Sequence, residues 1–193
     1  MYNGKMRTRT ASLLTLGVIA VFVVVWVSLL ALVGPSKLVS IIGVQNGYLL
    51  AFLIAAFGGF SSLTAVSLVA TIVTLSAGGL NPLLLGLFAG TGMTIGDLIY
   101  FYLGNAGRNA LHPESRLRAL VEKSSAWLSD KPKWMLPLVT FIYAGFLPLP
   151  NDVLTVSLAL AGGKMRVIVV PLFLGNIIHA SLYAYLGIAA WWL

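Results

Sequence analysis

The feature that most constrains the fold is a long stretch without charge, because no Asp, Glu, Lys, Arg or His stands between Leu38 and Gly96. A soluble domain carries about 25% charged residues, whereas this chain of 193 residues carries 9% and is 59% hydrophobic. A helix of about 20 apolar residues spans the hydrocarbon core of a bilayer, which is about 30 Å thick. The sequence therefore predicts an integral membrane protein built from helices.

Composition excludes several kinds of site. The chain has no cysteine, which rules out disulfides, thiolate metal sites and cysteine catalysis. Its two histidines, His112 and His179, are too few for a multi-histidine metal site, and we expect no cofactor. The net charge is +7, but the basic residues flank apolar segments. Membrane lipids with anionic headgroups are therefore the expected partners, and nucleic acid is not.

Glycine and proline divide the chain into helical segments. A basic tail precedes residues 11–33, which are uncharged and long enough for a first span; a cleaved signal peptide is the competing interpretation. Two later apolar segments are interrupted, at Gly58–Ser62 and at Pro148–Asp152. The apolar runs after the first span are predicted over residues 46–57, 62–77, 82–104, 134–147, 153–161 and 166–190.

Charge distribution separates the ways in which the two interrupted segments could meet the membrane. If both are re-entrant hairpins and the N-terminus is cytoplasmic, every basic residue except Lys37 lies inside, as the positive-inside rule requires. If each crosses once, the basic residues from Arg108 to Lys133 move outside. Paired crossings would give the same sidedness as hairpins, but most of the pieces are short for that.

We therefore predict an all-α integral membrane protein with three full spanning helices and two re-entrant helical hairpins. It would lie in the cell (cytoplasmic) membrane, with the N-terminus inside and the C-terminus outside. The segment 108–133 reads as a cytoplasmic amphipathic helix or as a plain linker helix. The expected units are 1–45 (basic tail and first span), 46–107 (first hairpin and span), 108–133, and 134–193 (second hairpin and last span).

The two halves of the chain align with a shift of 83 residues, which places Gly79 on Gly162 and Gly92 on Gly175. The strongest shared element is Tyr-x-Tyr-Leu-Gly, at residues 100–104 and 183–187. Each copy follows an interrupted segment, and in the predicted topology the two units enter from opposite sides. An inverted repeat of this kind is the plan of many secondary transporters, whose substrate sites lie near the membrane midplane.

Few ionisable residues fall inside the predicted membrane segments, where a charge costs about 2.5 to 3.5 kcal/mol on insertion scales. Asp97, in the second span, is a candidate proton or cation site, or else a hydrogen-bonded acid near the interface. Asp152 follows Pro148, Pro150 and Asn151 at the tip of the second hairpin. It could accept a proton or bind substrate; alternatively, Asn151 or Asp152 could cap a helix beginning near residue 153.

Three further residues complete the candidate set. Asn176 and His179 lie three apart on the last span and hence on one face, where His179 is a proton relay or a structural group. Arg108 ends the second span and either reaches the headgroups or binds a lipid phosphate. No catalytic motif is present, so we do not expect an enzyme. Close helix packing is expected at Gly86, Gly90, Gly92 and Gly96.

Several motifs together resemble the DedA/VTT (SNARE-associated Golgi protein) membrane family over most of the chain after about residue 45. They are Ala-Gly-Gly-Leu-Asn at 77–81, Gly-Asp-x-x-Tyr-x-x-x-Gly at 96–104 and Phe-Leu-Pro-Leu-Pro-Asn-Asp at 146–152. The resemblance implies inverted re-entrant hairpins and lipid transport, either flipping of lipid-linked phosphates or scrambling, with proton or cation coupling. The positions it carries over are Asp97, Arg108, Pro148 and Asp152.

This sequence departs from the family pattern at both tips, since it lacks the acidic residue of the first tip and the arginines of the second. It follows a Pro-x-Pro-Asn-Asp variety instead. We expect a transporter or flippase of a lipid phosphate or similar amphiphile, coupled to protons or cations. The alternatives are a small-molecule or cation exporter, a lipid scramblase, and a non-transporting scaffold that forms a homodimer through its glycine faces.

Overall fold

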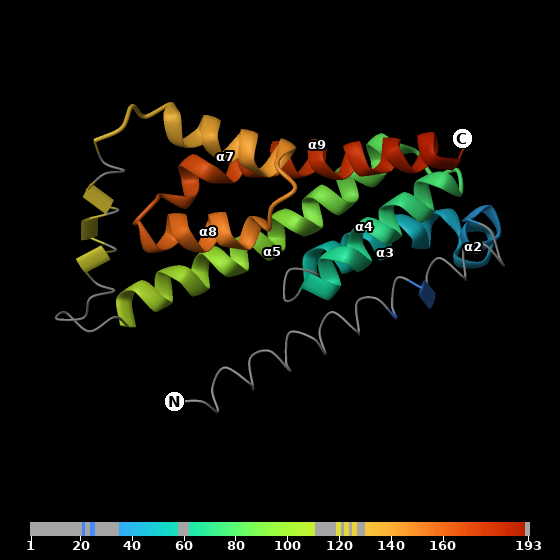
Figure 1. The fold of residues 1–193 in the computed structure, drawn as a ribbon, viewed down its shortest axis with the longest axis horizontal. Helices are drawn as coiled ribbons and strands as arrows, with labels where there is room; N and C mark the ends of the chain where they lie inside the picture. The colour runs from blue at the N-terminus through green and yellow to red at the C-terminus, as the bar shows by residue number, and fades with distance from the viewer. Residues whose placement is uncertain are drawn as a thin grey trace.

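The computed structural model describes residues 21, 24–25, 35–57, 62–110, 119–120, 122–123, 125–126 and 130–191, and within these every regular element is a helix. This confirms the all-α class. The helices are α2 (Pro35–Ile42), α3 (Val44–Phe57), α4 (Ser62–Ala77), α5 (Pro82–Ala110), α7 (Met135–Phe146), α8 (Asn151–Leu160) and α9 (Met165–Trp191) (Figure 1). Most of the predicted first span, the first hairpin tip except Ser62, and most of the amphipathic segment lie outside the described residues.

Two of the described helices are long and apolar enough to cross a membrane, Pro82–Asn109 in α5 and Met165–Ala190 in α9. They run antiparallel through the middle of the molecule (Figure 1). A bent pair, Ser36–Ile42 and Val44–Phe57, would make a third crossing if it counts as one span. The composition of these helices fits a membrane protein, and the large apolar side chains exposed on α5 and α9 fit contact with lipid.

The bend between α2 and α3 was not predicted from the sequence. The two helices meet at 92°, and Gly43 between them has φ +83°. Glycine adopts this left-handed backbone at little cost, whereas other residues are strained there. In the sequence, Gly43 has no proline or second glycine beside it. Nothing therefore distinguished it from the glycines that lie inside helices.

Helices α3–α4 and α7–α8 form two hairpins that enter the molecule from opposite ends. In Figure 1, α3 ends and α4 begins about midway along the bundle, and so do the end of α7 and the start of α8. The first arm of each hairpin packs on the long helix of its own half, α3 on α5 and α7 on α9. The second arm packs on the long helix of the other half, α4 on α9 and α8 on α5.

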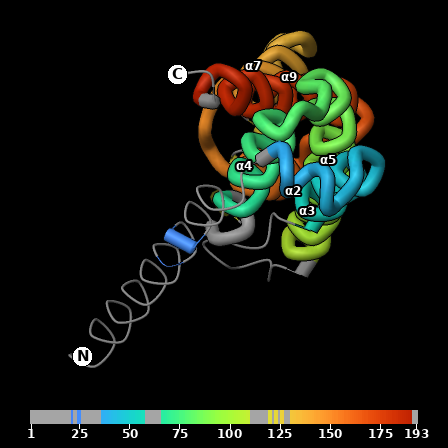
Figure 2. The backbone as a smooth tube through the Cα atoms, turned by 90° about the vertical axis from the view of Figure 1, so that its right-hand side faces the viewer, coloured from blue at the N-terminus to red at the C-terminus, as the bar shows by residue number. Residues whose placement is uncertain are grey.

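This exchange of second arms ties the two halves into one bundle, which Figure 2 shows turned by 90°. The two arms of each hairpin contact each other less than they contact the long helices. Each hairpin is therefore held in place mainly by α5 and α9, and only weakly by the contact between its own two arms.

The turn that follows each hairpin has the same backbone geometry in both halves. Gly79 and Gly162, which the 83-residue shift superimposes, have φ +102° and +77°. The N–H after each glycine donates to the carbonyl five residues back, at 3.1 Å in the first half and 2.8 Å in the second. This is the six-to-one bond of a Schellman motif, so the two turns are structural equivalents.

Aligned glycines also make equivalent packing contacts. Gly92 packs on α3 and its counterpart Gly175 on α7, while Gly104 packs on α8 and its counterpart Gly187 on α4. A Cβ at any of the four would lie closer than 3.0 Å to an atom of the neighbouring helix. Glycine is thus needed wherever a hairpin arm crosses a long helix, and the predicted close packing is confirmed.

The glycine faces of α5 are filled by the chain itself. Gly86 and Gly90 pack on α9, and Gly92 and Gly96 pack on α3. A homodimer would therefore need another surface than these faces.

Candidate functional site

A chain of buried hydrogen bonds joins α5, α9 and the start of α8. The Asn176 Nδ2 donates to the Asp97 Oδ2 at 2.8 Å and to the Thr94 Oγ1 at 3.1 Å. The Asn176 Oδ1 accepts a hydrogen bond from the Asn151 Nδ2 at 2.6 Å. Asn176 is completely buried, and no more than 9% of the other three side chains is exposed. We call Thr94, Asp97, Asn151 and Asn176 the Asp97 network.

The fold places this network where the second hairpin breaks. Asn151 is the first residue of α8, and Asp97 and Asn176 lie on the two long helices. Thr94 is one turn before Asp97 and donates to the Gly90 carbonyl at 2.8 Å. Apolar clusters lie on both sides of the network, one around Leu85, Ala89 and Ala180 and the other around Phe101, Ala159 and Ile168.

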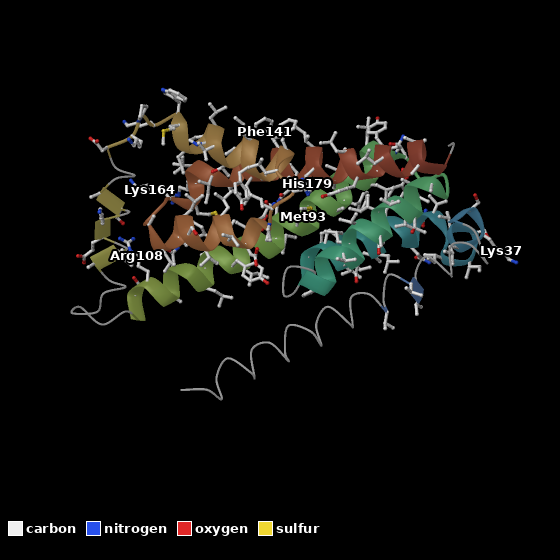
Figure 3. All side chains as sticks on the ribbon, viewed as in Figure 1. Lys37, Met93, Arg108, Phe141, Lys164 and His179 are labelled. Carbon is white, nitrogen blue, oxygen red and sulfur yellow. The ribbon has the colours of Figure 1, made fainter. Side chains whose placement is uncertain are left out.

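The network occurs in only one half of the repeat. The 83-residue shift places Ala180 on Asp97 and Met93 on Asn176, and Ala180 belongs to an apolar cluster against which Met93 packs. Met93 lies near the centre of the molecule (Figure 3). The two halves therefore share their packing but not their polar chemistry.

Asp152 lies beside the network without joining its hydrogen bonds. Its negative charge is close enough to that of Asp97 for the two to repel each other. The Asp152 Oδ1 accepts the Val153 N–H at 3.0 Å, and the Tyr143 hydroxyl donates to the Pro150 carbonyl at 3.3 Å. The half-buried Asp152 carboxylate at the start of α8 thus lies near the buried Asp97 carboxyl group on α5.

The predicted capping role of Asn151 or Asp152 is wrong. Helix α8 begins at Asn151, two residues earlier than expected, and its N-cap is Pro150, with φ −61° and ψ 123°. Proline fixes φ near the helical value and has no N–H to satisfy, so the helix starts directly after it. Pro148 and Pro150 are both exposed, and they shape the break without contributing a side chain to the network.

His179 lies outside the chain of hydrogen bonds, although it is near the centre of the molecule (Figure 3). Its ring makes an edge-to-face contact with Tyr183 at 4.8 Å between centroids. It also interacts with the backbone of Gly145 on α7. His179 therefore shares a helix face with Asn176 but does not join the Asp97 network, because the His179 side chain interacts with α7 instead.

Arg108 is separate from the network, about 16 Å from Asp97 along the axis of α5. Its Nη2 donates to the Ser125 Oγ at 3.2 Å, and that hydroxyl donates to the Ala161 carbonyl at 2.6 Å. The guanidinium also covers Gly162. Arg108 therefore holds the turn between α8 and α9, and α5 continues past it to Ala110, inside the segment predicted as cytoplasmic.

Sequence reasoning missed two features of the network. Thr94 stands three residues before Asp97, a spacing that puts both on one helix face and could have identified it. The second feature is an unpaired acceptor: the Asn151 Oδ1 is buried and has no hydrogen-bond partner among the described residues. No sequence pattern predicts such an atom, because it depends on which side chains converge from three helices.

No protein-family model matches this chain, and no curated protein or solved structure is significantly similar to it. The function is therefore argued from the geometry of the Asp97 network and the repeat.

Proposed function

We propose that this protein is a membrane transporter that moves a lipid phosphate or a similar amphiphile across the bilayer, coupled to protons or cations. The observation that carries the proposal is the buried Asp97 network at the break of the second hairpin. An aspartate inside a membrane helix is rare because it is costly, and it usually marks a substrate or ion pathway. Broken helices meeting near the midplane are where secondary transporters bind their substrates.

In this proposal α5 and α9 span the membrane and the two hairpins are re-entrant. The distribution of basic residues supports one orientation: Arg108 and Lys164 lie at one end of the molecule and Lys37 at the other (Figure 3). Lys131, Lys133 and Arg166 accompany the first group in sequence. The end with Arg108 would be cytoplasmic, which agrees with an N-terminus inside and a C-terminus outside.

An amphiphilic substrate fits the surroundings of the second hairpin break. Phe146, Leu149 and Val153 flank the break, and at least half of each side chain is exposed. An acyl or prenyl chain could lie against these residues while its headgroup meets the polar start of α8. The DedA/VTT resemblance of the Pro-x-Pro-Asn-Asp segment implies the same class of substrate.

The test is lipid translocation in proteoliposomes, measured with a labelled lipid phosphate in the presence and absence of a pH gradient. We expect gradient-dependent movement in the parent protein and its loss in Asp97→Asn. Asp130→Asn is the matched control, because Asp130 is exposed and lies outside the bundle helices. Size-exclusion profiles and helical content should be the same for all three proteins.

The other outcomes separate the alternatives. Lipid movement that does not depend on the pH gradient and persists in Asp97→Asn would indicate a scramblase. Transport of soluble cations without lipid movement would indicate an exporter on the same scaffold. No movement of either kind in a well-folded sample would reject transport and leave the scaffold hypothesis.

A further inference from the structure

Helix α2 is too short to cross a membrane, and its direction does not extend the path of α3. Its 8 residues measure about 12 Å, whereas the hydrocarbon core is about 30 Å thick. The 92° bend at Gly43 sets α2 almost perpendicular to α3, which packs on α5 and runs toward the middle of the bundle (Figure 1). Since α5 spans the membrane in the proposed orientation, α2 lies parallel to the membrane surface.

The end of the bundle that holds α2 carries exposed polar side chains. Lys37 lies at this end, opposite to the α8–α9 turn (Figures 1 and 3). Gln45 and Asn46 at the start of α3 are exposed, as is Asn81, whose Oδ1 accepts the Leu83 N–H at 2.9 Å where α5 begins. Polar groups without a partner are costly in hydrocarbon. This end of the bundle therefore marks the boundary between the hydrocarbon core and the headgroups.

The side chains of α2 are sorted around the helix axis. Val39 is buried in the apolar cluster that includes Leu80, so this side of α2 faces the bundle. Ser36 and Ser40 are exposed and lie one turn apart, on one polar side. Ile41 is 69% exposed and lies about 140° around the axis from Ser36. A helix with separate polar and apolar sides, lying parallel to the membrane, suits the interface between headgroups and acyl chains.

Lys37 lies between these two sides of α2, because it precedes Ser40 by three residues and Ile41 by four. Its side chain is exposed. In the sequence it is the only charged residue between Arg9 and Asp97, so α2, α3 and α4 contain no acidic residue to pair with it. A lysine at the interface lays its apolar stem along the acyl chains and extends its ammonium to the headgroups. Its charge is complementary to that of a lipid phosphate.

We propose that α2 is an interfacial helix whose partner is the phospholipid surface: Ile41 enters the acyl boundary and the Lys37 ammonium binds a lipid phosphate. Ser36 and Ser40 face the water. Because Val39 packs in one cluster with residues of α4, this contact with the surface fixes the depth of the first hairpin in the membrane. The inference goes beyond the proposed function and requires only that α5 and α9 span the bilayer, so it holds whether or not the protein moves lipid.

Spin labels test the proposal in the full chain, because the chain has no cysteine of its own. Nitroxides are attached to Ser36→Cys and to Ile41→Cys, one at a time, in nanodiscs of phosphatidylcholine and phosphatidylglycerol. Leu182→Cys, at an exposed position well inside α9, is the reference for hydrocarbon, and Asp130→Cys, exposed and outside the bundle helices, is the reference for water. Collision rates with oxygen, which enters lipid, and with a water-soluble nickel chelate give the depth of each label.

We expect the Ile41 label about 5 to 10 Å below the headgroup surface and the Ser36 label as accessible to nickel as the water reference. Adding Lys37→Glu should shift the Ile41 label toward water, because the new carboxylate is repelled by phosphatidylglycerol. Lys37→Arg keeps the positive charge and should leave the depth unchanged. Lys164→Glu is the matched control, since Lys164 is exposed at the opposite end of the molecule (Figure 3), and it should not move the label.

Four results would overturn the proposal. Ser36 and Ile41 labels that both lie as deep as the hydrocarbon reference would show that α2 continues α3 as one span. Two labels that are both in water would show that α2 does not touch the bilayer. An Ile41 label that neither oxygen nor nickel reaches would show that another protein segment, or a second copy of the chain, covers this side. A depth that Lys37→Glu does not change would reject the phosphate contact.

Discussion

At the scale of single residues, Asn176 connects the whole polar network. It is completely buried and uses both hydrogens and the oxygen of its amide, toward Asp97, Thr94 and Asn151. An amide can do this because it carries donors and an acceptor on one planar group. A carboxylate has no hydrogen to donate and a hydroxyl has only one, so neither could donate to both Asp97 and Thr94 while accepting from Asn151.

We predict that Asn176→Leu destabilises the protein by about 2 to 4 kcal/mol, because it leaves the Asp97 carboxyl and the Asn151 amide buried without their partner. Thermal unfolding in detergent measures the effect. Asn109→Leu is the control: Asn109 is exposed near the end of α5, and a surface substitution should change stability by no more than about 0.5 kcal/mol. Equal Tm values for the two variants would contradict the importance of the network.

At this scale the sequence allowed part of the site to be predicted. Asp97, Asn151 and Asn176 were candidates because polar residues in apolar segments need a reason to be there. His179 and Arg108 satisfied the same criterion and lie elsewhere, His179 toward α7 and Arg108 over the α8–α9 turn. Periodicity assigns a residue to a face of its own helix, but it does not show which neighbouring helix covers that face.

At the scale of elements, glycine decides where the hairpin arms can lie. The aligned residues Gly92 and Gly175 each bring a long helix into contact with the first arm of its own hairpin. Gly107, on the same helix as Gly92, has nothing within 4 Å of where its Cβ would be. Comparing Gly92 with Gly107 therefore distinguishes the packing role of glycine from the effect of its low helix propensity.

We predict opposite effects of alanine at these positions. Gly92→Ala and Gly175→Ala should each lower stability by about 1 to 3 kcal/mol, because the added methyl group forces the helices apart. Gly107→Ala should raise stability by up to about 1 kcal/mol, because alanine favours the helix. Thermal unfolding of the three variants gives the signs, and a stabilising Gly92→Ala would show that α3 does not contact α5 this closely.

Helix boundaries were the most predictable part of the fold. Segments predicted at 62–77, 82–104 and 166–190 correspond to α4, α5 and α9 within a few residues, apart from the longer end of α5. Apolar runs ended by glycine pairs or by proline give clear limits. The exchange of second arms between halves could not be predicted, because pairing of helices depends on contacts that are distant in sequence.

At the scale of the whole molecule, a symmetric frame carries an asymmetric site. The turns at Gly79 and Gly162 and the glycine contacts repeat, whereas the Asp97 network has an apolar counterpart around Ala180 and Met93. In our proposal the equivalent packing of the two hairpins allows the substrate to enter from either side of the membrane. The single acidic site couples the movement of the substrate to one proton.

Proton movement driven by the substrate tests this account most directly. Proteoliposomes with a pH-sensitive dye inside receive a lipid phosphate, with no gradient imposed at the start. The account predicts a pH change inside the vesicles for the parent protein and for Asp130→Asn, and none for Asp97→Asn. Lipid movement without any pH change in the parent, or an unchanged signal in Asp97→Asn, would contradict the claim that the Asp97 network couples a proton to transport.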